Sequence, residues 1–349
     1  MGKTNVKKAL VHNPYWDSMG GGERYCASVV KALLDTGWQV SLDWYDQTLP
    51  EKLEERFGIG ISQVKIVDKH QKGWGYGLCF WVSDGSIPLL FSKNNLLHMQ
   101  IPFHGVGGAR WLNQQKLKRI DHVVCNSNFT KAVIDREFKI ASDVIYPPVD
   151  VAKFHAGEKE KIILYVGRFS QLKQNKNQEF LIDFFSGLSK QSAMLGWRLI
   201  LAGGSGVGDG GFLDNLKKKA KGVQIEFVEN PDFLTLSDLY AKAKIFWSAA
   251  GFGSDENSAP EVMEHFGITL VEAMASGCIP VVYNGGGHKE IVNDEFGFLW
   301  NTKEELEEIF VKINEDENIN LFMTQKAIER SRNYSFSVFE KSLLETIKI

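Results

Sequence analysis

The feature that most constrains the fold is the regular alternation of short apolar runs with helix-favouring segments along nearly the whole chain. Runs such as residues 7–12 (KKALVH), 161–167 (KIILYVG) and 278–283 (CIPVVY) are each followed by a segment with a helical pattern. Near-continuous apolar strands that alternate with helices are typical of parallel sheets covered by helices on both faces. The sequence therefore predicts an α/β protein.

The alternation predicts the individual elements and a break between two domains. Strands are expected at residues 7–12, 38–44, 64–67, 78–82, 96–100, 122–126, 161–167, 197–204, 223–228, 244–249 and 278–283. Paired prolines in residues 146–150 (YPPVD) interrupt the pattern, because proline stops helices and breaks sheets. A chain of 349 residues also favours two domains. We predict doubly wound, Rossmann-like domains at 1–148 and 155–332. Residues 333–349 are predicted as an amphipathic C-terminal helix, for which packing on the N-terminal domain is one option.

Composition excludes several classes of protein. The net charge of −3 provides no general electrostatic case for binding nucleic acid. The longest apolar runs, such as residues 87–91, are far shorter than the roughly 20 residues that a membrane-spanning helix needs. The first residues show no signal peptide, so we expect a cytoplasmic protein, with peripheral association at the inner membrane face as a further option.

The four cysteines indicate no metal site or disulfide framework. Cys26, Cys79, Cys125 and Cys278 form no CxxC pair, and each lies in an apolar segment. This pattern favours buried, reduced thiols.

Three clusters lie where ligands gather in open parallel sheets, at the carboxyl ends of strands. The first is MGGGER, in which Gly21 and Gly22 open the helix predicted over residues 21–37. Glycines let a backbone approach a ligand, and the amides at a helix N-terminus favour anions. The spacing is not GxGxxG, which disfavours an NAD-linked dehydrogenase even though Asp43 ends the second strand. A tight turn without a ligand is the alternative.

The second cluster is GRFSQLKQNKN (residues 167–177), directly after the first strand of the second domain. Arg168 and Lys173 flank a turn, and together they can hold a diphosphate and stabilise it as it departs. Two exposed basic residues on a loop are the alternative.

The third cluster is EHFGITLVEAMASG (residues 264–277). We expect a helix with Thr269 as its N-cap and Gly277 at its end, which puts Glu264 before the helix and Glu272 in its first turn. Glu272 can accept hydrogen bonds from both hydroxyls of a ribose, and Glu264 can hold sugar hydroxyls. The alternative is that Glu264 is a loop charge and Glu272 an acid that favours the helix dipole.

The backbone between these two glutamates is also predicted to contact the ligand. The amides of Phe266, Gly267 and Ile268 are expected to face phosphate or sugar oxygens. The two acids would then hold the two ends of one ligand, with its phosphates near the start of the helix.

The segment EHFGITLVEAMASGCIPVV resembles the E-x7-E segment of retaining GT-B glycosyltransferases of the large family 4. The resemblance continues in the family's order through GGGER, CNSNFT (125–130), YPPVD, VGRFSQLKQNKN and GGGHKEIV (285–292), and it covers nearly the whole chain. HNPYWDSMGGGER and HFGI are most similar to α-1,2-mannosyltransferases of lipid-linked oligosaccharide assembly. The resemblance implies a GT-B fold, with two Rossmann-like domains facing a central cleft.

The resemblance also implies roles for individual residues around a nucleotide-diphosphate sugar. Arg168 and Lys173 match the pair that contacts the diphosphate. Glu272 matches the ribose ligand, and Glu264 matches the ligand of the donor sugar. The remaining donor-binding positions that it implies are Gly21, Gly22, Val228, Asn230, His265, Phe266, Gly267 and Ile268, with the base near residues 228–230.

Two histidines are candidates for the histidine that the family often has at the cleft wall. His98 matches a histidine that the family often has there and is the catalytic candidate, while His104 is its rival. A structural role is the alternative for each. Asp84 either faces the acceptor or forms an Asp-Gly turn. Residues 251–263 form a long polar insertion that either shapes acceptor choice or is a surface loop.

Together these observations predict a retaining glycosyltransferase. It would move a hexose, with mannose from GDP-mannose as the first choice, to a hydroxyl of a glycan or lipid-linked acceptor. No cofactor or nucleic acid is expected. No metal is expected either, because cationic side chains take its place at the diphosphate. A sugar-nucleotide 2-epimerase and a non-catalytic sugar-nucleotide-binding protein are the alternatives.

Overall fold

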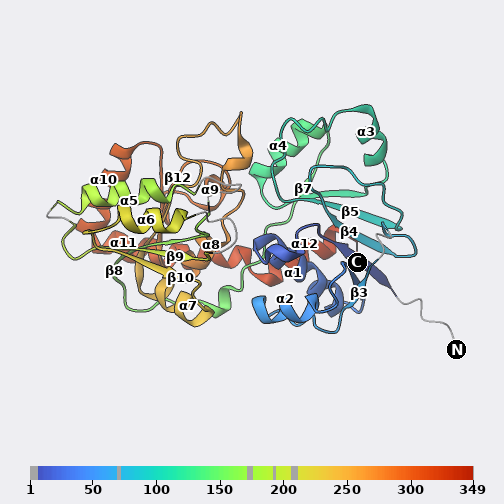
Figure 1. Ribbon diagram of the computed structural model, residues 1–349, viewed down its shortest axis with the longest axis horizontal. Helices are drawn as coiled ribbons and strands as arrows, with labels where there is room; N and C mark the ends of the chain where they lie inside the picture. Colours follow the sequence, from blue (N-terminus) through green and yellow to red (C-terminus); the bar gives the residue numbers. More distant parts are fainter. Residues whose placement is uncertain (1–6, 69–71, 171–175, 192–193, 206–210, 349) are drawn as a thin grey trace. The chain divides into compact units, whose positions relative to one another are not determined.

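The computed structural model describes residues 7–68, 72–170, 176–191, 194–205 and 211–348, in two compact units (Figure 1). Unit 1 comprises Met1–Pro148 together with Phe336–Ile349, and unit 2 comprises Val149–Ser335. The chain therefore passes from unit 1 to unit 2 directly after the paired prolines.

Unit 1 is built on a seven-stranded parallel sheet in the order β3-β2-β1-β4-β5-β6-β7. Its strands are β1 (Lys8–His12), β2 (Gln39–Asp43), β3 (Lys65–Val67), β4 (Leu78–Val82), β5 (Asn94–Met99), β6 (His122–Cys125) and β7 (Asp143–Val144). Its helices are α1 (Gly21–Asp35), α2 (Leu49–Phe57), α3 (Trp111–Leu117), α4 (Asn128–Phe138) and α12 (Phe336–Thr346).

The last helix, α12, belongs to unit 1 although it follows unit 2 in the sequence. Its residues Phe339 and Leu343 are buried in the same apolar core as Val29 of α1 and Val11 of β1. The ring of Phe339 meets Tyr25 of α1 edge-on, with 5.2 Å between the ring centroids. Figure 1 shows α12 in red beside the blue α1. Burial of this apolar stripe holds the end of the chain on unit 1.

Unit 2 contains a six-stranded parallel sheet in the order β10-β9-β8-β11-β12-β13. Its strands are β8 (Glu160–Val166), β9 (Arg198–Gly203), β10 (Ile225–Glu229), β11 (Ala243–Ser248), β12 (Ile279–Tyr283) and β13 (Phe298–Trp300). Its helices are α5 (Gln178–Leu188), α6 (Phe212–Lys219), α7 (Phe233–Lys242), α8 (Ile268–Ala275), α9 (His288–Ile291), α10 (Lys303–Glu315) and α11 (Glu317–Ser331).

The predicted α/β class and the predicted strands are confirmed. Each expected strand is present, and its ends agree with the prediction to within two residues. The short strands β7 and β13 were not predicted, since two or three residues are too few to show a pattern. All four cysteines are buried and free, as expected. No helix among the described residues is long and apolar enough to cross a bilayer.

A glycine at the end of β9 sets how closely two loops of unit 2 approach each other. A Cβ on Gly203 would clash with the backbone carbonyl oxygen of Gly167, which follows β8. The same contact is held by hydrogen bonds from Gly167 N to Ala202 O (3.0 Å) and from Phe169 N to Gly204 O (2.9 Å). The turn that carries Arg168 is thereby fixed against the end of β9.

We therefore expect Gly203→Ala to lower the free energy of unfolding by about 2 kcal/mol, because backbone atoms would have to move apart. Chemical denaturation with urea would measure the change. Gly187→Ala is the matched control, since Gly187 is exposed on α5 and an added Cβ there meets no atom. The control should be neutral or stabilising by up to about 1 kcal/mol. Equal stability of the two variants would refute the role of Gly203.

Candidate functional site

The predicted donor-site residues of unit 2 follow the carboxyl ends of its parallel strands. Because neighbouring parallel strands end at the same edge of a sheet, the loops after β8, β9, β10, β11 and β12 lie along one edge. Arg168 follows β8, Asn230 follows β10, and the residues from Glu264 to Glu272 lie between β11 and β12.

Arg168 is exposed on a well-anchored turn. Its backbone carbonyl accepts a hydrogen bond from Gln178 Nε2 at 2.9 Å, and the neighbouring Phe169 side chain is buried. The guanidinium also lies close enough to the buried hydroxyl of Tyr165 to influence its pKa. Burial, and then the charge of Glu264, raise the pKa of Tyr165, whereas Arg168 lowers it. Arg168 and Glu264 therefore act on the same tyrosine. Lys173 lies outside the described residues.

Glu264 forms an ion pair that the sequence analysis did not include. Its Oε2 lies 2.6 Å from Nζ of Lys176, and the two side chains are only 15 % and 20 % exposed. Burial by itself would raise the pKa of Glu264, but Lys176, His288 and His265 outweigh it and lower the pKa to about 2. The carboxylate is consequently ionised at neutral pH. Lys176 lies in the basic segment 167–177, so the sequence shows its charge but does not indicate that it pairs with Glu264.

Two histidines lie next to this pair, of which His288 is buried and His265 is half-buried. His265 Nε2 contacts the carbonyl of Glu261 at 3.1 Å, and His288 Nδ1 contacts the carbonyl of Tyr283 at 3.0 Å. Burial lowers the pKa of each to about 4, although Glu264 acts in the opposite direction. Both rings are therefore neutral at pH 7, and Lys176 provides the positive charge beside Glu264.

A glycine turn after β12 packs directly against the backbone of Glu264. Gly286 has a left-handed φ of +58°, and a Cβ there would clash with the carbonyl oxygen of Glu264. Gly287 N donates to the same carbonyl at 2.7 Å. The turn therefore fixes the position of Glu264, and it requires glycine for both conformation and space.

The predicted insertion reaches the same turn. Glu256, within residues 251–263, accepts hydrogen bonds from Gly286 N at 3.2 Å and from Lys289 Nζ at 2.6 Å. The insertion is thus attached to the glycine turn next to Glu264.

The start of α8 differs from the prediction. The helix begins at Ile268 after Gly267, whose φ is +111°, so Gly267 rather than Thr269 is the N-cap. Glu272 lies in the second turn instead of the first, because the helix starts earlier than the pattern indicated. It is 7 % exposed, and Tyr240 of α7 donates a hydrogen bond to its Oε2 at 3.1 Å. Tyr240 therefore orients this carboxylate.

The side chain of Phe266 has a structural role. It is 2 % exposed and meets Tyr334 edge-on, with 5.3 Å between the ring centroids. The Phe266 side chain is therefore not available to a ligand, and the ligand contact of the amides at 266–268 stays a prediction.

The predicted base-binding residues lie at the end of β10. Asn230 has a φ of +47°, and its N–H donates to Gly203 O at 2.8 Å. Its side-chain oxygen accepts from Ser205 N at 3.1 Å, while Val228 is half-buried within the strand. Asn230 thus organises the turn after β9.

In unit 1, the glycine segment opens α1 as predicted. Gly20 is the N-cap, and its N–H donates to Glu23 Oε2 at 2.7 Å. Gly21 is the first helical residue, and a Cβ on Gly22 would clash with the side chain of Gln100. The end of the Gln100 side chain therefore lies close to the first turn of α1, and a larger residue at position 22 would have to displace it.

The two candidate histidines of unit 1 differ in their surroundings. His98 is fully buried in β5, stacks on Tyr25 with 4.2 Å between centroids, and has Nδ1 3.1 Å from Val124 O. Burial lowers its pKa to about 3, and its Nε2 has no hydrogen-bond partner among the described residues. A ring buried in this way cannot touch a ligand from where it lies, which favours the structural alternative. His104 is exposed near Glu137.

Residues 149–332, more than half of the chain, match the family described as glycosyl transferases group 1. The chain belongs to this family. The match begins at the first residue of unit 2, so it covers Arg168, Glu264, Glu272 and the glycine turn.

Group 1 relatives with curated names include several mannosyltransferases. A GDP-Man:Man(3)GlcNAc(2)-PP-Dol alpha-1,2-mannosyltransferase from Dictyostelium discoideum is 27 % identical over 63 % of this chain and 45 % of its own length. Its counterpart from Xenopus tropicalis is 32 % identical over 51 % of this chain and 38 % of its own length. The chain thus spans less than half the length of these relatives.

Solved structures share the fold. A glycosyltransferase from Rickettsia africae superposes with a TM-score of 0.75 over 98 % of this chain and 97 % of its own, at 18 % identity. HepE from Anabaena, in complex with UDP and glucose, gives a TM-score of 0.71 over 98 % and 99 %, at 17 % identity. The group 1 chain described here thus has the GT-B fold, with two Rossmann-like domains.

Proposed function

We propose that this chain is a retaining, metal-independent hexosyltransferase that uses a nucleotide-diphosphate sugar. The observation that carries the proposal is the Lys176–Glu264 ion pair, held by a glycine turn at the sheet edge where Arg168 is also anchored. An ionised, oriented carboxylate suits the hydroxyls of a donor sugar, and an exposed guanidinium suits its diphosphate. The names of the relatives, which specify GDP-Man, support mannose as the sugar.

The proposed chemistry follows from where charge develops. As the bond from the anomeric carbon to phosphate breaks, negative charge grows on the diphosphate, and Arg168, Lys173 and the α8 amides stabilise it. The acceptor hydroxyl attacks from the same face, and the departing phosphate oxygen takes its proton. Cationic side chains thereby do the work for which other transferases use a metal ion. Glu264 stays ionised and holds hydroxyls of the sugar.

A transfer assay tests this proposal. The protein would be incubated with GDP-mannose and a lipid-linked glycan, with and without EDTA, and the product's anomeric configuration read by NMR. We expect an α-linked product, the configuration of the donor, at the same rate in EDTA. A β-linked product would contradict retention, and loss of the rate in EDTA would contradict metal independence. A thermal-shift panel of GDP-, UDP- and ADP-sugars would identify the base, since the bound donor raises the melting temperature.

Glu272→Gln is expected to weaken nucleoside-diphosphate binding by about tenfold, because charge-assisted hydrogen bonds to the ribose hydroxyls are lost. Isothermal titration calorimetry with GDP measures the change. Tyr240→Phe is the matched variant: it removes the hydroxyl that donates to Glu272 but leaves the carboxylate. It should have a smaller effect, and unchanged affinity in Glu272→Gln would remove the ribose assignment.

A further inference from the structure

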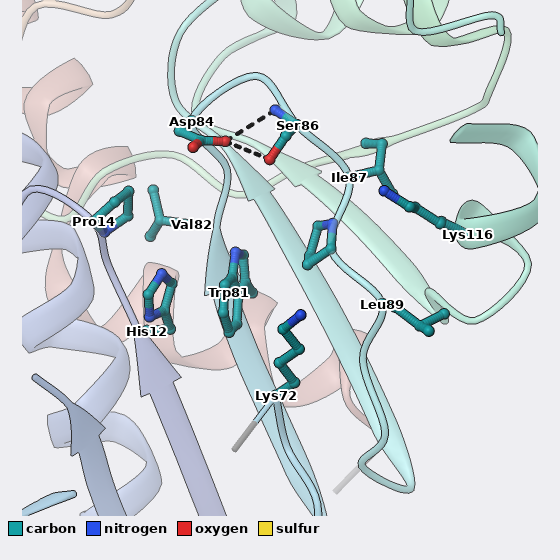
Figure 2. Close-up of a pocket in the computed structure, with 11 residues that line it drawn as sticks. His12, Pro14, Lys72, Trp81, Val82, Asp84, Ser86, Ile87, Leu89 and Lys116 are labelled. Atoms are coloured by element: carbon teal, nitrogen blue, oxygen red, sulfur yellow. Dashed lines mark hydrogen bonds between the residues drawn. The ribbon is translucent and has the colours of Figure 1, made fainter. Parts of the chain in front are cut away.

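Unit 1 contains a pocket of about 340 Å³ at the carboxyl ends of β1 and β4 (Figure 2). This volume is within the range of small-molecule sites, roughly 300–1,000 Å³. Its lining combines the rings of His12 and Trp81, two lysines, and the aliphatic side chains of Ile87 and Leu89. None of these residues was assigned a role above.

The ring wall of the pocket is rigid. His12 and Trp81 stack with 3.6 Å between centroids and an interplanar angle of 21°. His12 Nδ1 also lies 3.1 Å from Oδ2 of Asp43, which is buried at the end of β2. Contacts from the two neighbouring strands thus hold the imidazole in place. The stacked His12 in turn fixes Trp81, the more exposed of the two rings, as an aromatic wall of the pocket.

Two lysines reach the pocket from separate elements. Figure 2 shows Lys72 extending beside Trp81, and Lys116 extending from α3 toward Ile87. Neither amino group forms an ion pair or hydrogen bond with any residue that the structure describes. The backbone of Lys72 is fixed, because its carbonyl accepts from Phe91 N at 2.8 Å. Two ammonium groups that line one pocket favour an anion with several oxygens, such as a phosphate or diphosphate.

The remaining charges of the pocket leave it positive beside the lysines. Asp84 is its one lining carboxylate, and its Oδ1 accepts from Ser86 N at 3.0 Å and Ser86 Oγ at 2.6 Å. Asp43 contacts His12 and is not itself part of the lining. Figure 2 places Asp84 at the opposite side of the pocket from Lys72, next to Val82. A carboxylate there can accept a hydrogen bond from a sugar hydroxyl, while the lysines bind a phosphate.

An apolar rim adjoins the lysine side. Leu89 is 39 % exposed, and the neighbouring rings of Phe91 and Trp74 are exposed as well, in edge-on contact at 5.8 Å. Arg119 fixes this rim, since its Nε donates to Leu90 O at 2.8 Å. Exposed apolar side chains beside a phosphate-sized positive site suit a ligand whose phosphate carries an apolar chain.

We propose that this pocket binds the phosphate end of the acceptor, an apolar chain joined through phosphate or diphosphate to a sugar. Lys72 and Lys116 hold the phosphate, the apolar rim contacts the chain, and Trp81 with Asp84 receives the first sugar. This inference rests on the proposed function, because it assumes that the chain glycosylates an acceptor.

Calorimetry on the full chain tests the pocket with four probes: decyl diphosphate, decyl mannoside, inorganic pyrophosphate and GDP-mannose. Lys72→Gln and Lys116→Gln should each weaken decyl diphosphate binding about tenfold and leave GDP-mannose affinity unchanged. Lys72→Arg should keep most of the binding. Lys118→Gln is the matched control, since Lys118 is an exposed lysine just past α3 that contacts Gln115 instead of the pocket.

Each outcome decides a separate point. Unchanged decyl diphosphate affinity in the Lys72/Lys116 double variant, or an equal loss in Lys118→Gln, overturns the phosphate site. Equal affinity for pyrophosphate and decyl diphosphate overturns the contact with an apolar chain and indicates a free anion. Failure of GDP-mannose and other sugar nucleotides to bind, while lysine-dependent diphosphate binding persists, refutes the proposed function and leaves the anion site standing.

Discussion

Arg168→Ala is expected to lower turnover by about 10²–10³-fold, equivalent to the roughly 3–4 kcal/mol lost when one preorganised contact to a developing charge is removed. The guanidinium is exposed beyond the end of β8, and the turn is held by backbone contacts that alanine keeps. The loss should therefore appear in kcat, with the free energy of unfolding changed by less than about 0.5 kcal/mol. Steady-state kinetics at saturating donor would measure it.

Arg198→Ala is the matched control for this prediction. Arg198 opens β9, so it lies at the opposite edge of the same sheet, where it pairs with Glu160 at 2.8 Å. Exposed pairs of this kind contribute only about 0–1 kcal/mol, and this variant should transfer sugar normally. Arg168→Lys should keep part of the rate, because it retains the charge but not the planar fork. A normal rate in Arg168→Ala would remove this residue from leaving-group stabilisation.

The fold could be predicted from the sequence because each element carries its own periodicity. Residues 162–166 of β8 and all of β12 are apolar, which is the signature of strands buried on both faces. The start of α8 was predicted too late because Thr269 is a common capping residue, whereas the structure caps the helix with a glycine of positive φ. Capping preferences describe side chains, and here backbone conformation determines where the helix begins.

The site was only partly predictable, because its partners are distant in sequence. Glu264 was identified from its motif, but Lys176 is 88 residues away and shows no local pattern that links the two. The pairing of His12 with Asp43 likewise depends on β1 and β2 being neighbours in the sheet. For His98 the motif indicated a candidate site residue, but a motif cannot show whether a side chain is buried, and the ring of His98 is fully buried.

Lys176→Met is expected to destabilise the folded protein by about 3–5 kcal/mol at pH 7, because it leaves Glu264 as a mostly buried carboxylate without its cation. The neighbouring His265 and His288 cannot replace that charge, since burial lowers their pKa values to about 4. Lys289→Met is the matched control. It breaks a pair of the same length, 2.6 Å to Glu256, whose side chains are 39 % and 32 % exposed, and it should cost at most about 1 kcal/mol.

The pH dependence of the Lys176→Met effect follows from the direction of each shift. In the wild type the pKa of Glu264 is about 2, below its ordinary value of 4.5, so ionised Glu264 adds stability that is complete above pH 4.5 and is lost as the pH falls toward 2. In the variant only His288 and His265 still oppose the effect of burial, and both are neutral at pH 7, so we expect the pKa of Glu264 to rise and its ionisation to become destabilising as the pH rises. The difference in unfolding free energy should therefore be large at pH 7 and shrink toward pH 3.

Urea denaturation at several pH values would measure this difference, and adding Glu264→Gln to the variant should recover part of the lost stability. A difference that stays constant with pH would show that Lys176 stabilises the fold by packing and not by its charge.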